Sequence, residues 1–329
     1  MSAQPTSAKR EMAKAVVIVA LVQFVVGGWF SWTASRSEPT HVPVAVVAGS
    51  TQQKQLDSLL TANGGDFDTR HVKDVDEAAE MLRDREVYGA FVQDDSAGHG
   101  WRLKVASAAS PAVAAALSGQ LAELTGTSQL IEEAVPVSGS DPHGSGMTMG
   151  FFPLIVTAVI IALLLVLKVS EARLRLIGVV AFAAVSGLLS SLMLTVVSDV
   201  LPGSFLTNAA AIFLLELGMA GFITGLGALV GPGGIAVGAV VMFLVGNPLS
   251  GIAAGPDLLP GPLGRVGQLL PPGAAGSFIR AEGSFAGTGS GGPLAVLLGW
   301  AVVALALLAL AVVKGRRRRP EDARVLQNV

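Results

Sequence analysis

The chain has 329 residues, of which 51% are hydrophobic and only 14% are charged, and its mean hydropathy is +0.62. This balance excludes an ordinary soluble domain and predicts an integral membrane protein. The formal net charge of -2 gives no electrostatic footprint for a nucleic-acid partner, and the absence of cysteine excludes disulfides, cysteine-ligated metals and cysteine nucleophiles.

The N-terminal segment, residues 1–14, is polar and contains three basic residues before an apolar run. Residues 15–34 are about long enough to cross a bilayer, and Trp29 and Trp32 suit its outer interface. Because no clear A-x-A cleavage site follows, an uncleaved anchor is favoured over a signal peptide. We therefore predict a cytoplasmic N-terminal segment that leads into a first transmembrane helix.

Residues 41–146 predict a small extracytoplasmic α/β domain. Asp74 stands three residues before Glu77 at the start of an apolar periodic segment, which indicates a capping box and a helix. Strands and helices alternate along the domain, as in helices packed on a sheet. The other expected elements are strands at 42–48, 87–92, 103–106 and 128–137 and helices at 52–62 and 111–124.

This domain shows no catalytic pattern. Its charged residues are spread over helix faces, and neither a Ser/His/Asp order with a nucleophile elbow nor a carboxylate pair is present. The four histidines, His41, His71, His99 and His143, lack metal-motif spacing, so we expect no metal site. The domain is interpreted as a module for contact, without catalytic residues.

Five further apolar segments follow a glycine-containing hinge at residues 144–146. Residues 149–255 hold four of them, transmembrane helices 2–5, and residues 294–314 hold the sixth span. The sequence therefore predicts a polytopic α-helical membrane protein with six transmembrane helices. Helices 2–5 are expected at 149–167, 176–197, 209–230 and 235–254.

Basic residues set the predicted orientation. They cluster in residues 1–14, between the second and third spans, and in the tail at 315–329. The positive-inside rule places these clusters and both termini in the cytoplasm, and the α/β domain outside. The run at 316–319 is interpreted first as an orientation anchor, with binding of anionic membrane lipids as a second interpretation.

Residues 246–276, the Pro-Gly segment, follow the fifth span and are too rich in Pro and Gly for a continuous helix. Irregular backbone at a membrane must be interfacial or sheltered by protein, so we predict a re-entrant or interfacial structure on the outer face. Four apolar residues at helical spacing predict a short amphipathic helix that Pro271 and Pro272 would stop. These residues are Leu259, Leu263, Val266 and Leu270. An ordinary Pro-rich loop is the alternative.

Glu216 lies in the middle of the fourth span, where a carboxylate is costly unless it is paired or faces a polar cavity. Two interpretations stay open. Glu216 and Asn208 could line a transport pathway, or a neutral Glu216 could form a polar clamp. The clamp partners would be Asn208, Thr224, Ser186 or Ser190. A stripe of glycines on the same helix, from Gly218 to Gly231, predicts close packing against other helices.

No nucleotide-binding loop is present. The pattern G-x-x-x-x-G-K-[ST] does not occur, and GPGG at 231–234 is expected to be a tight turn between two spans. We therefore expect no cofactor and no enzymatic activity of the chain itself. The energy for transport would come from a partner or from an ion gradient.

Three phrases are similar to one known family: DVDEAAEMLRDREVYGAFV at 74–92, GNPLSG at 246–251 and GQLLPPGAAGSFIR at 267–280. The order of parts agrees as well: one span, an external domain, then five spans with a Pro-Gly break before the last. Over nearly its whole length the chain resembles the permease subunits of ABC type-2 transporters, in the bacterial branch related to the phage infection protein (YhgE/Pip). Its external domain is much shorter than in the long relatives.

The resemblance implies an export permease of the bacterial cell membrane that forms a homodimer or pairs with another permease. It would couple to a separate ABC ATPase subunit through the N-terminal segment near residues 8–14 and the loop at 170–175. The Pro-Gly segment would form an outer gate. The coupling residues implied are Lys168, Glu171, Arg173 and Arg175. The gate residues implied are Asn247, Pro248, Gln268, Leu270, Pro271, Pro272 and Gly273.

Two other functions are compatible with the residues. One is a membrane-anchored scaffold or receptor whose external domain binds a partner. The other is an ion-coupled transporter that uses Glu216. The sequence does not identify the substrate beyond a preference for an amphipathic or lipid-like molecule.

Overall fold

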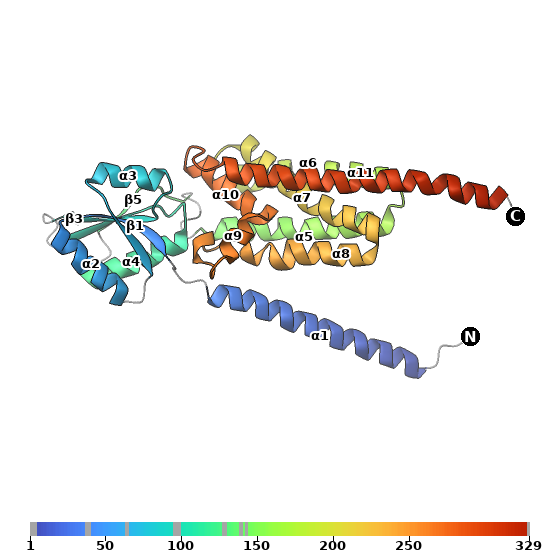
Figure 1. Cartoon of the computed structure of the whole chain (residues 1–329), viewed down its shortest axis with the longest axis horizontal. Helices are drawn as coiled ribbons and strands as arrows, with labels where there is room; N and C mark the ends of the chain where they lie inside the picture. The colour runs from blue at the N-terminus through green and yellow to red at the C-terminus, as the bar shows by residue number, and fades with distance from the viewer. Residues whose placement is uncertain are drawn as a thin grey trace.

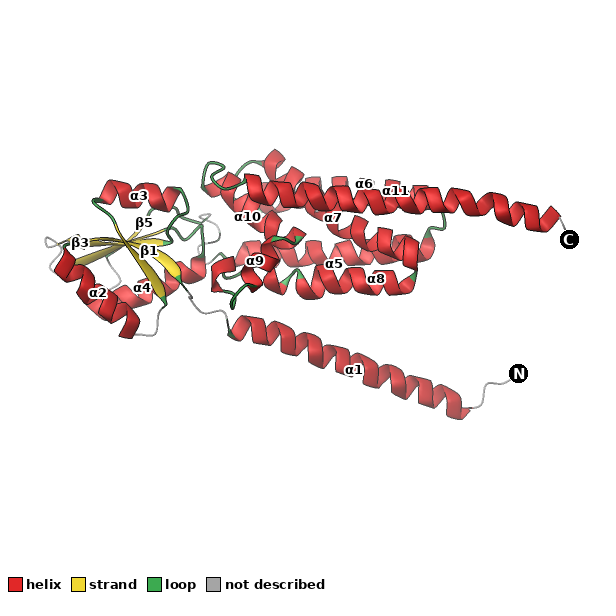
Figure 2. Cartoon of the chain, in the orientation of Figure 1, coloured by secondary structure: helices red, strands yellow, loops and turns green. Residues whose placement is uncertain are grey.

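Strands and most helices separate into two parts of the molecule, as Figure 2 shows by colour. The computed structural model describes residues 5–36, 41–62, 66–94, 100–126, 130–137, 141 and 144–327. An α/β domain lies at one end of a helical bundle (Figure 1). Helix α1 (Pro5–Ser35) begins, and helix α11 (Gly291–Gln327) ends, at the opposite end of the molecule (Figure 1). This arrangement places both ends of the described chain on the same side.

The α/β domain contains β1 (Val42–Val47), α2 (Ser50–Ala62), β2 (Phe67–His71), α3 (Val75–Arg83), β3 (Gly89–Asp94), β4 (Gly100–Val105), α4 (Pro111–Thr125) and β5 (Ile131–Glu133). The strands form one mixed sheet in the order β2-β1-β3-β4-β5, in which only the β3–β4 pair is antiparallel among the described residues. Helix α3 covers one face, and α2 and α4 cover the other (Figure 1). Apolar strand residues therefore have a core on both sides.

The predicted elements of this domain are largely confirmed. The side chain of Asp74 accepts a hydrogen bond from the Glu77 backbone N–H at 2.9 Å, which caps α3 as the sequence indicated. Strand β2 was not predicted, because it is an edge strand with little buried surface and no apolar alternation. Strand β5 has only three residues, and part of the range predicted for it, 128–129, lies outside the described residues.

The bundle is made of α5 (Ser145–Lys168), α6 (Ala172–Ser191) continued by the π-helix η2 (Leu192–Val197), α7 (Phe205–Val230), α8 (Pro232–Ala239) continued by the π-helix η3 (Val240–Val245), and α11. Four helical stretches in the described chain are long and apolar enough to cross a membrane, and they begin at residues 145, 172, 205 and 291. The chain is therefore a helical membrane protein.

Helix α7 is the centre of this bundle. Within its most apolar stretch 72% of the residues are buried, against 22–28% in the other three membrane-length helices. The glycine stripe explains how neighbours come so close, because a Cβ added at Gly225 would lie 2.6 Å from the Leu307 Cβ of α11. At Gly221 the same addition would lie 2.8 Å from the Ala304 Cβ. The prediction of close packing is confirmed from Gly218 to Gly227, whereas a Cβ added at Gly231 would meet nothing within 4 Å.

The predicted fifth span is wrong in its second half. The apolar helical stretch runs only from Pro232 to Val245, and irregular backbone follows to residue 254. Pro248 begins a short 3-10 turn, η4 (Pro248–Ser250), and Gly251 at φ 66° takes a left-handed conformation that ends it. Proline supplies no N–H for a continuing helix, so the chain turns here instead of extending to Ala254. The GPGG turn is also tighter than predicted, because Pro232 already begins α8.

The rest of the Pro-Gly segment folds into short helices: η5 (Pro256–Leu258), α9 (Leu263–Gln268) and the start of α10 (Pro271–Ser284). The predicted amphipathic helix is present only as the six residues of α9. Pro271 and Pro272 follow the end of α9, as predicted, but they also occupy the first turn of α10, a helix that the sequence reading missed. Residues 271–281 of α10 are all buried, so the ordinary-loop alternative does not describe this segment.

Helix α1 contacts the rest of the protein near its C-terminal end. The indole N–H of Trp29 donates a hydrogen bond of 2.8 Å to the Leu244 carbonyl, and the rings of Phe30 and Phe243 lie 6.1 Å apart. Toward its N-terminus α1 leads away from the bundle (Figure 1). Apolar side chains of that part are exposed, including Phe24 with 79% of its surface free. Such a surface suits lipid or another helix.

Candidate functional site

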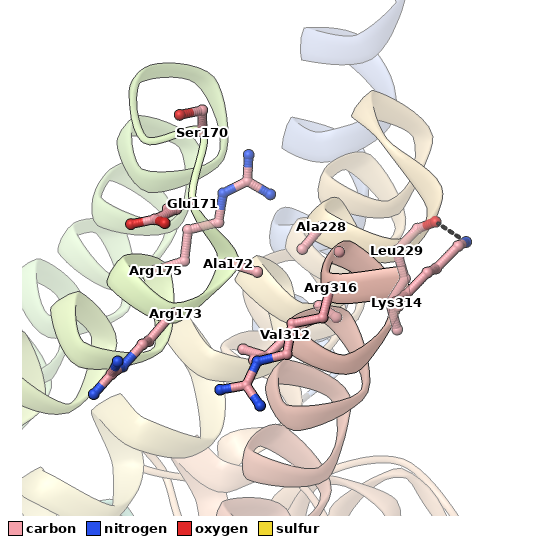
Figure 3. Close-up of a pocket in the computed structure, with 12 residues that line it drawn as sticks. Ser170, Glu171, Ala172, Arg173, Arg175, Ala228, Leu229, Val312, Lys314 and Arg316 are labelled. Atoms are coloured by element: carbon pink, nitrogen blue, oxygen red, sulfur yellow. Dashed lines mark hydrogen bonds between the residues drawn. The ribbon is translucent and has the colours of Figure 1, made fainter. Parts of the chain in front are cut away.

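A pocket of about 430 Å³, drawn in Figure 3, is lined by parts of the bundle that lie at its end away from the α/β domain (Figure 1). Four parts of the chain meet there: the loop between α5 and α6, the first turn of α6, the last turn of α7, and α11. We call it the distal pocket. Its lining residues are Ser170, Glu171, Ala172, Arg173, Arg175, Ala228, Leu229, Ala311, Val312, Lys314, Gly315 and Arg316.

Three of the four predicted coupling residues, Glu171, Arg173 and Arg175, line the distal pocket. Lys168 is the last residue of α5; it is exposed and is not among the lining residues. The sequence does not predict that α11 contributes to this pocket: Lys314 and Arg316 are interpreted there as orientation signals, with lipid binding as the second interpretation of the run at 316–319. Four cations and one carboxylate line the pocket, which gives a formal net charge of +3.

Two of these cations stabilise helix ends. The Arg175 guanidinium donates through Nε to the Val169 carbonyl at 2.7 Å and through Nη2 to the Val166 carbonyl at 3.1 Å, at the C-terminus of α5. The Lys314 ammonium donates to the Leu229 carbonyl at 3.4 Å, at the C-terminus of α7. Cations in these positions pair the last carbonyls of a helix and oppose its negative end. They hold the walls of the distal pocket in place.

The other two cations, Arg173 and Arg316, are exposed. In Figure 3 their side chains extend in the same direction from α6 and α11, whereas Lys314 turns toward Leu229. Neither forms an ion pair with a carboxylate within the part of the chain that the structure describes. The distal pocket can therefore attract an anionic group from outside the chain.

Glu216 lies in α7 and is fully buried. The Ser186 hydroxyl of α6 donates to its Oε1 atom at 3.1 Å, while its Oε2 atom has no hydrogen-bond partner among the described residues. Asn208 does not meet it, because the Asn208 side-chain N–H groups donate to Thr195 Oγ1 and to the Pro202 carbonyl. Of the partners considered for a polar clamp, Ser186 is the one in contact. Thr224 has no hydrogen-bond partner for its hydroxyl in the described structure.

Six of the seven predicted gate residues fall into two groups. Asn247 and Pro248 line a pocket of about 200 Å³ between α1, α5 and the Pro-Gly segment. Leu270 precedes α10, and the first turn of that helix is buried in the bundle. That turn consists of Pro271, Pro272 and Gly273.

Gln268 fastens the irregular backbone to α10. Its side-chain N–H donates to the Ser250 carbonyl at 2.8 Å, and its side-chain oxygen accepts from the Ser277 hydroxyl at 2.5 Å. Backbones also approach closely here, because a Cβ added at Gly267 would lie 1.5 Å from the Leu249 carbonyl oxygen. The Pro-Gly segment is therefore a packed structure held by its own polar contacts.

The α/β domain packs on the Pro-Gly segment. The Tyr88 hydroxyl donates a hydrogen bond to Asp257, and the Ser110 hydroxyl donates one to the Ala254 carbonyl. Leu258 belongs to the apolar core between the sheet and helices α2 and α4. Burial, together with the Asp257 carboxylate, raises the pKa of Tyr88 above its ordinary value. The domain and the segment are thus one packed unit.

Arg280 is a buried cation that the sequence reading did not single out. Its guanidinium donates to the carbonyls of Gly251 and Ile252 in the Pro-Gly segment. Burial, and secondarily the nearby Arg85 cation, lowers the pKa of Arg280 to about 10. A charged residue inside the otherwise apolar stretch at 271–281 was the available signal. Arg280 supplies a donor to the Ile252 carbonyl and a second one to the Gly251 carbonyl, which also accepts from the Gly255 backbone N–H.

Among the described residues no group of three His, Asp or Glu side chains could hold a metal ion. Two of the four histidines, His99 and His143, lie outside that part of the chain. No protein-family model, no curated protein and no solved structure matches this chain.

Proposed function

We propose that this chain is the permease subunit of an exporter, driven by a separate ABC ATPase subunit and moving an amphipathic or lipid-like substrate outward. In this proposal α1 and the helix Pro232–Val245 join the four membrane-length helices as six spans of a bacterial cell membrane. Both termini and the distal pocket face the cytoplasm, where basic residues belong. The α/β domain and the Pro-Gly segment then face outward.

The observation that carries the proposal is that α7 contacts both regions that an export cycle would couple, the predicted coupling loop and the predicted gate helix. Its last turn, with Ala228 and Leu229, forms a wall of the distal pocket beside the predicted coupling loop. Near its middle, a Cβ added at Gly218 would lie 3.7 Å from the Pro271 ring of α10. A displacement of the coupling loop by a partner would reach the gate helix through one rigid, buried element.

The ATPase partner is tested by detergent pull-down from the native membrane. We expect an ABC ATPase subunit to be retained by the wild-type chain, and expect Lys168→Glu with Glu171→Lys to reduce its capture. The matched control exchanges an exposed cation outside the distal pocket, Arg265→Glu on α9, and should retain the ATPase. If no ATPase accompanies the wild-type chain, the scaffold function becomes the better account.

The gate is tested separately. Replacing both Pro271 and Pro272 by Ala removes two buried rings from the start of α10 and frees its backbone. We expect slower ATP-dependent efflux from vesicles with normal membrane insertion. Normal efflux in this variant would eliminate the Pro-Gly segment as the gate.

A further inference from the structure

We infer that the distal pocket binds a phosphate group, presented by an anionic lipid headgroup or free in solution. This inference does not depend on the proposed export function, because it concerns what the pocket of the isolated chain can hold. The first support is the charge of the pocket. Arg173, Arg175, Lys314 and Arg316 surround one space with a single carboxylate, that of Glu171.

The donors of the pocket are suited to phosphate. Arg173 and Arg316 form no ion pair within the described residues, and each guanidinium has a planar set of N–H donors that matches two phosphate oxygens. Their side chains extend in the same direction in Figure 3. Lys314 gives one hydrogen bond to Leu229, and its ammonium has three donors in total.

The first turn of α6 adds to this preference. Its N-cap residue, Glu171, makes no side-chain capping bond, and no acidic side chain lies in the first turn. Early backbone N–H groups of a helix and the positive end of its dipole attract anions. This feature alone would not define a site. Here the N-terminus of α6 lines the distal pocket, to which α11 contributes the positive charges of Lys314 and Arg316.

The position of the pocket favours a lipid source. The apolar stretch of α6 begins at Ala172, and that of α11 ends at Arg316, so both membrane-length helices reach their polar boundary at the pocket. Phosphates of lipid headgroups are concentrated at this depth. Exposed apolar residues lie next to the pocket, including Leu174 and Val313, and would accompany the acyl chains. Basic pockets between membrane helices hold lipid headgroups for these reasons.

The test uses the purified full chain in detergent, with short-chain phosphatidylglycerol as the anionic probe and phosphatidylcholine as the zwitterionic one. Bound lipid is measured by native mass spectrometry. The test variant is Arg173→Gln with Arg316→Gln, which removes two cations that form no ion pair in the described structure. The control variant is Arg83→Gln with Arg265→Gln, which removes two exposed cations outside the pocket. Thermal unfolding checks that all proteins are folded.

We expect the wild-type and control chains to bind phosphatidylglycerol about tenfold more tightly than the test variant, and the preference to weaken at high salt. Inorganic phosphate is then added as a competitor. Displacement of the lipid at equal phosphate concentration would support free phosphate as the ligand, and retention would support the lipid headgroup. Equal binding by wild type and test variant, or equal binding of both lipids, would overturn the inference.

Discussion

The hydroxyl of Tyr88, in the α/β domain, donates a hydrogen bond to the carboxylate of Asp257, 169 positions further along the chain. This contact joins a loop of the domain to the Pro-Gly segment between two parts of the membrane bundle. A second contact joins the domain to the end of α10: the guanidinium of Arg85, in the α/β domain, lies 5.1 Å from the centre of the ring of Phe285, which follows that helix. The domain is therefore fastened to the segment that the sequence singled out as irregular.

The Tyr88 contact makes a prediction that can be read by absorbance, because Tyr88 is the only tyrosine in the chain. Burial and Asp257 raise its pKa, so the phenolate should form well above pH 10 in the folded protein. A raised pKa contributes stability that is fully present below about pH 10, the unfolded value, and is lost as pH rises through the folded value. Alkaline titration, followed by ultraviolet absorbance, measures this directly.

The partner of Tyr88 gives the matched comparison. Asp257→Asn removes the neighbouring negative charge and should bring the phenolate transition to lower pH. Asp76→Asn, at an exposed site in the first turn of α3, should leave the transition in place. An ordinary tyrosine titration in the wild-type chain would show that Tyr88 is not held at this junction.

The glycine stripe predicts a steric effect at Gly225. Gly225→Ala would place a Cβ 2.6 Å from the Leu307 Cβ, so α7 and α11 would have to separate. We expect a loss of about 1–3 kcal/mol in stability, measured by thermal unfolding in detergent. Gly299→Ala in α11 is the control, because a Cβ there meets nothing within 4 Å. This control should be neutral or slightly stabilising, since alanine favours a helix.

Glu216→Gln should be tolerated. The amide oxygen keeps an acceptor for the Ser186 hydroxyl and brings no ionisable group into the bundle. We expect unfolding within about 1 kcal/mol of the wild type, and a similarly small loss for Ser186→Ala, because hydrogen bonds between membrane helices average about 0.6 kcal/mol. Flux driven by a pH gradient in vesicles should also be unchanged. Loss of that flux would instead favour the ion-coupled transporter.

Arg280 should matter more than an exposed arginine. Arg280→Met keeps much of the side-chain volume but leaves the Ile252 carbonyl without this donor, while the Gly251 carbonyl keeps only the Gly255 backbone N–H. Unsatisfied buried acceptors cost about 1–3 kcal/mol, so we expect faster proteolysis within the Pro-Gly segment and a lower unfolding temperature. Arg265→Met, exposed on α9, is the control. Equal behaviour of the two variants would contradict the assigned role.

The sequence predicted those elements that depend on the order of neighbouring residues alone. Apolar length identified the four membrane-length helices, and the spacing of Asp74 and Glu77 identified the start of α3. It could not place the end of the helix at Val245, since apolar residues recur up to Ala254 around the polar Asn247 and Ser250, and the turn is decided by Pro248 and Gly251. Local pattern also treated Pro271 as a stop, whereas tertiary burial makes it the first residue of α10.

Candidate-site prediction had a similar limit. Residues such as Arg173, in the first turn of α6, were found because they are charged and lie between two predicted spans. Their assembly with Lys314 and Arg316 depends on α11 packing along α7, which no local pattern encodes. Likewise, an arginine such as Arg280 is expected at the surface, and its burial can be predicted only when the carbonyls that accept its hydrogen bonds are known from the fold.

The place of Leu258 in the core of the α/β domain has a consequence for biosynthesis. Strands β1 to β5 leave the ribosome before any of α5, α6, α7 or α8. Leu258 and Asp257 emerge only after these helices, so the domain begins to fold with a gap in its apolar core. Insertion of the bundle and closure of that gap must be completed together, and a chain arrested before the Pro-Gly segment should carry a less protected domain.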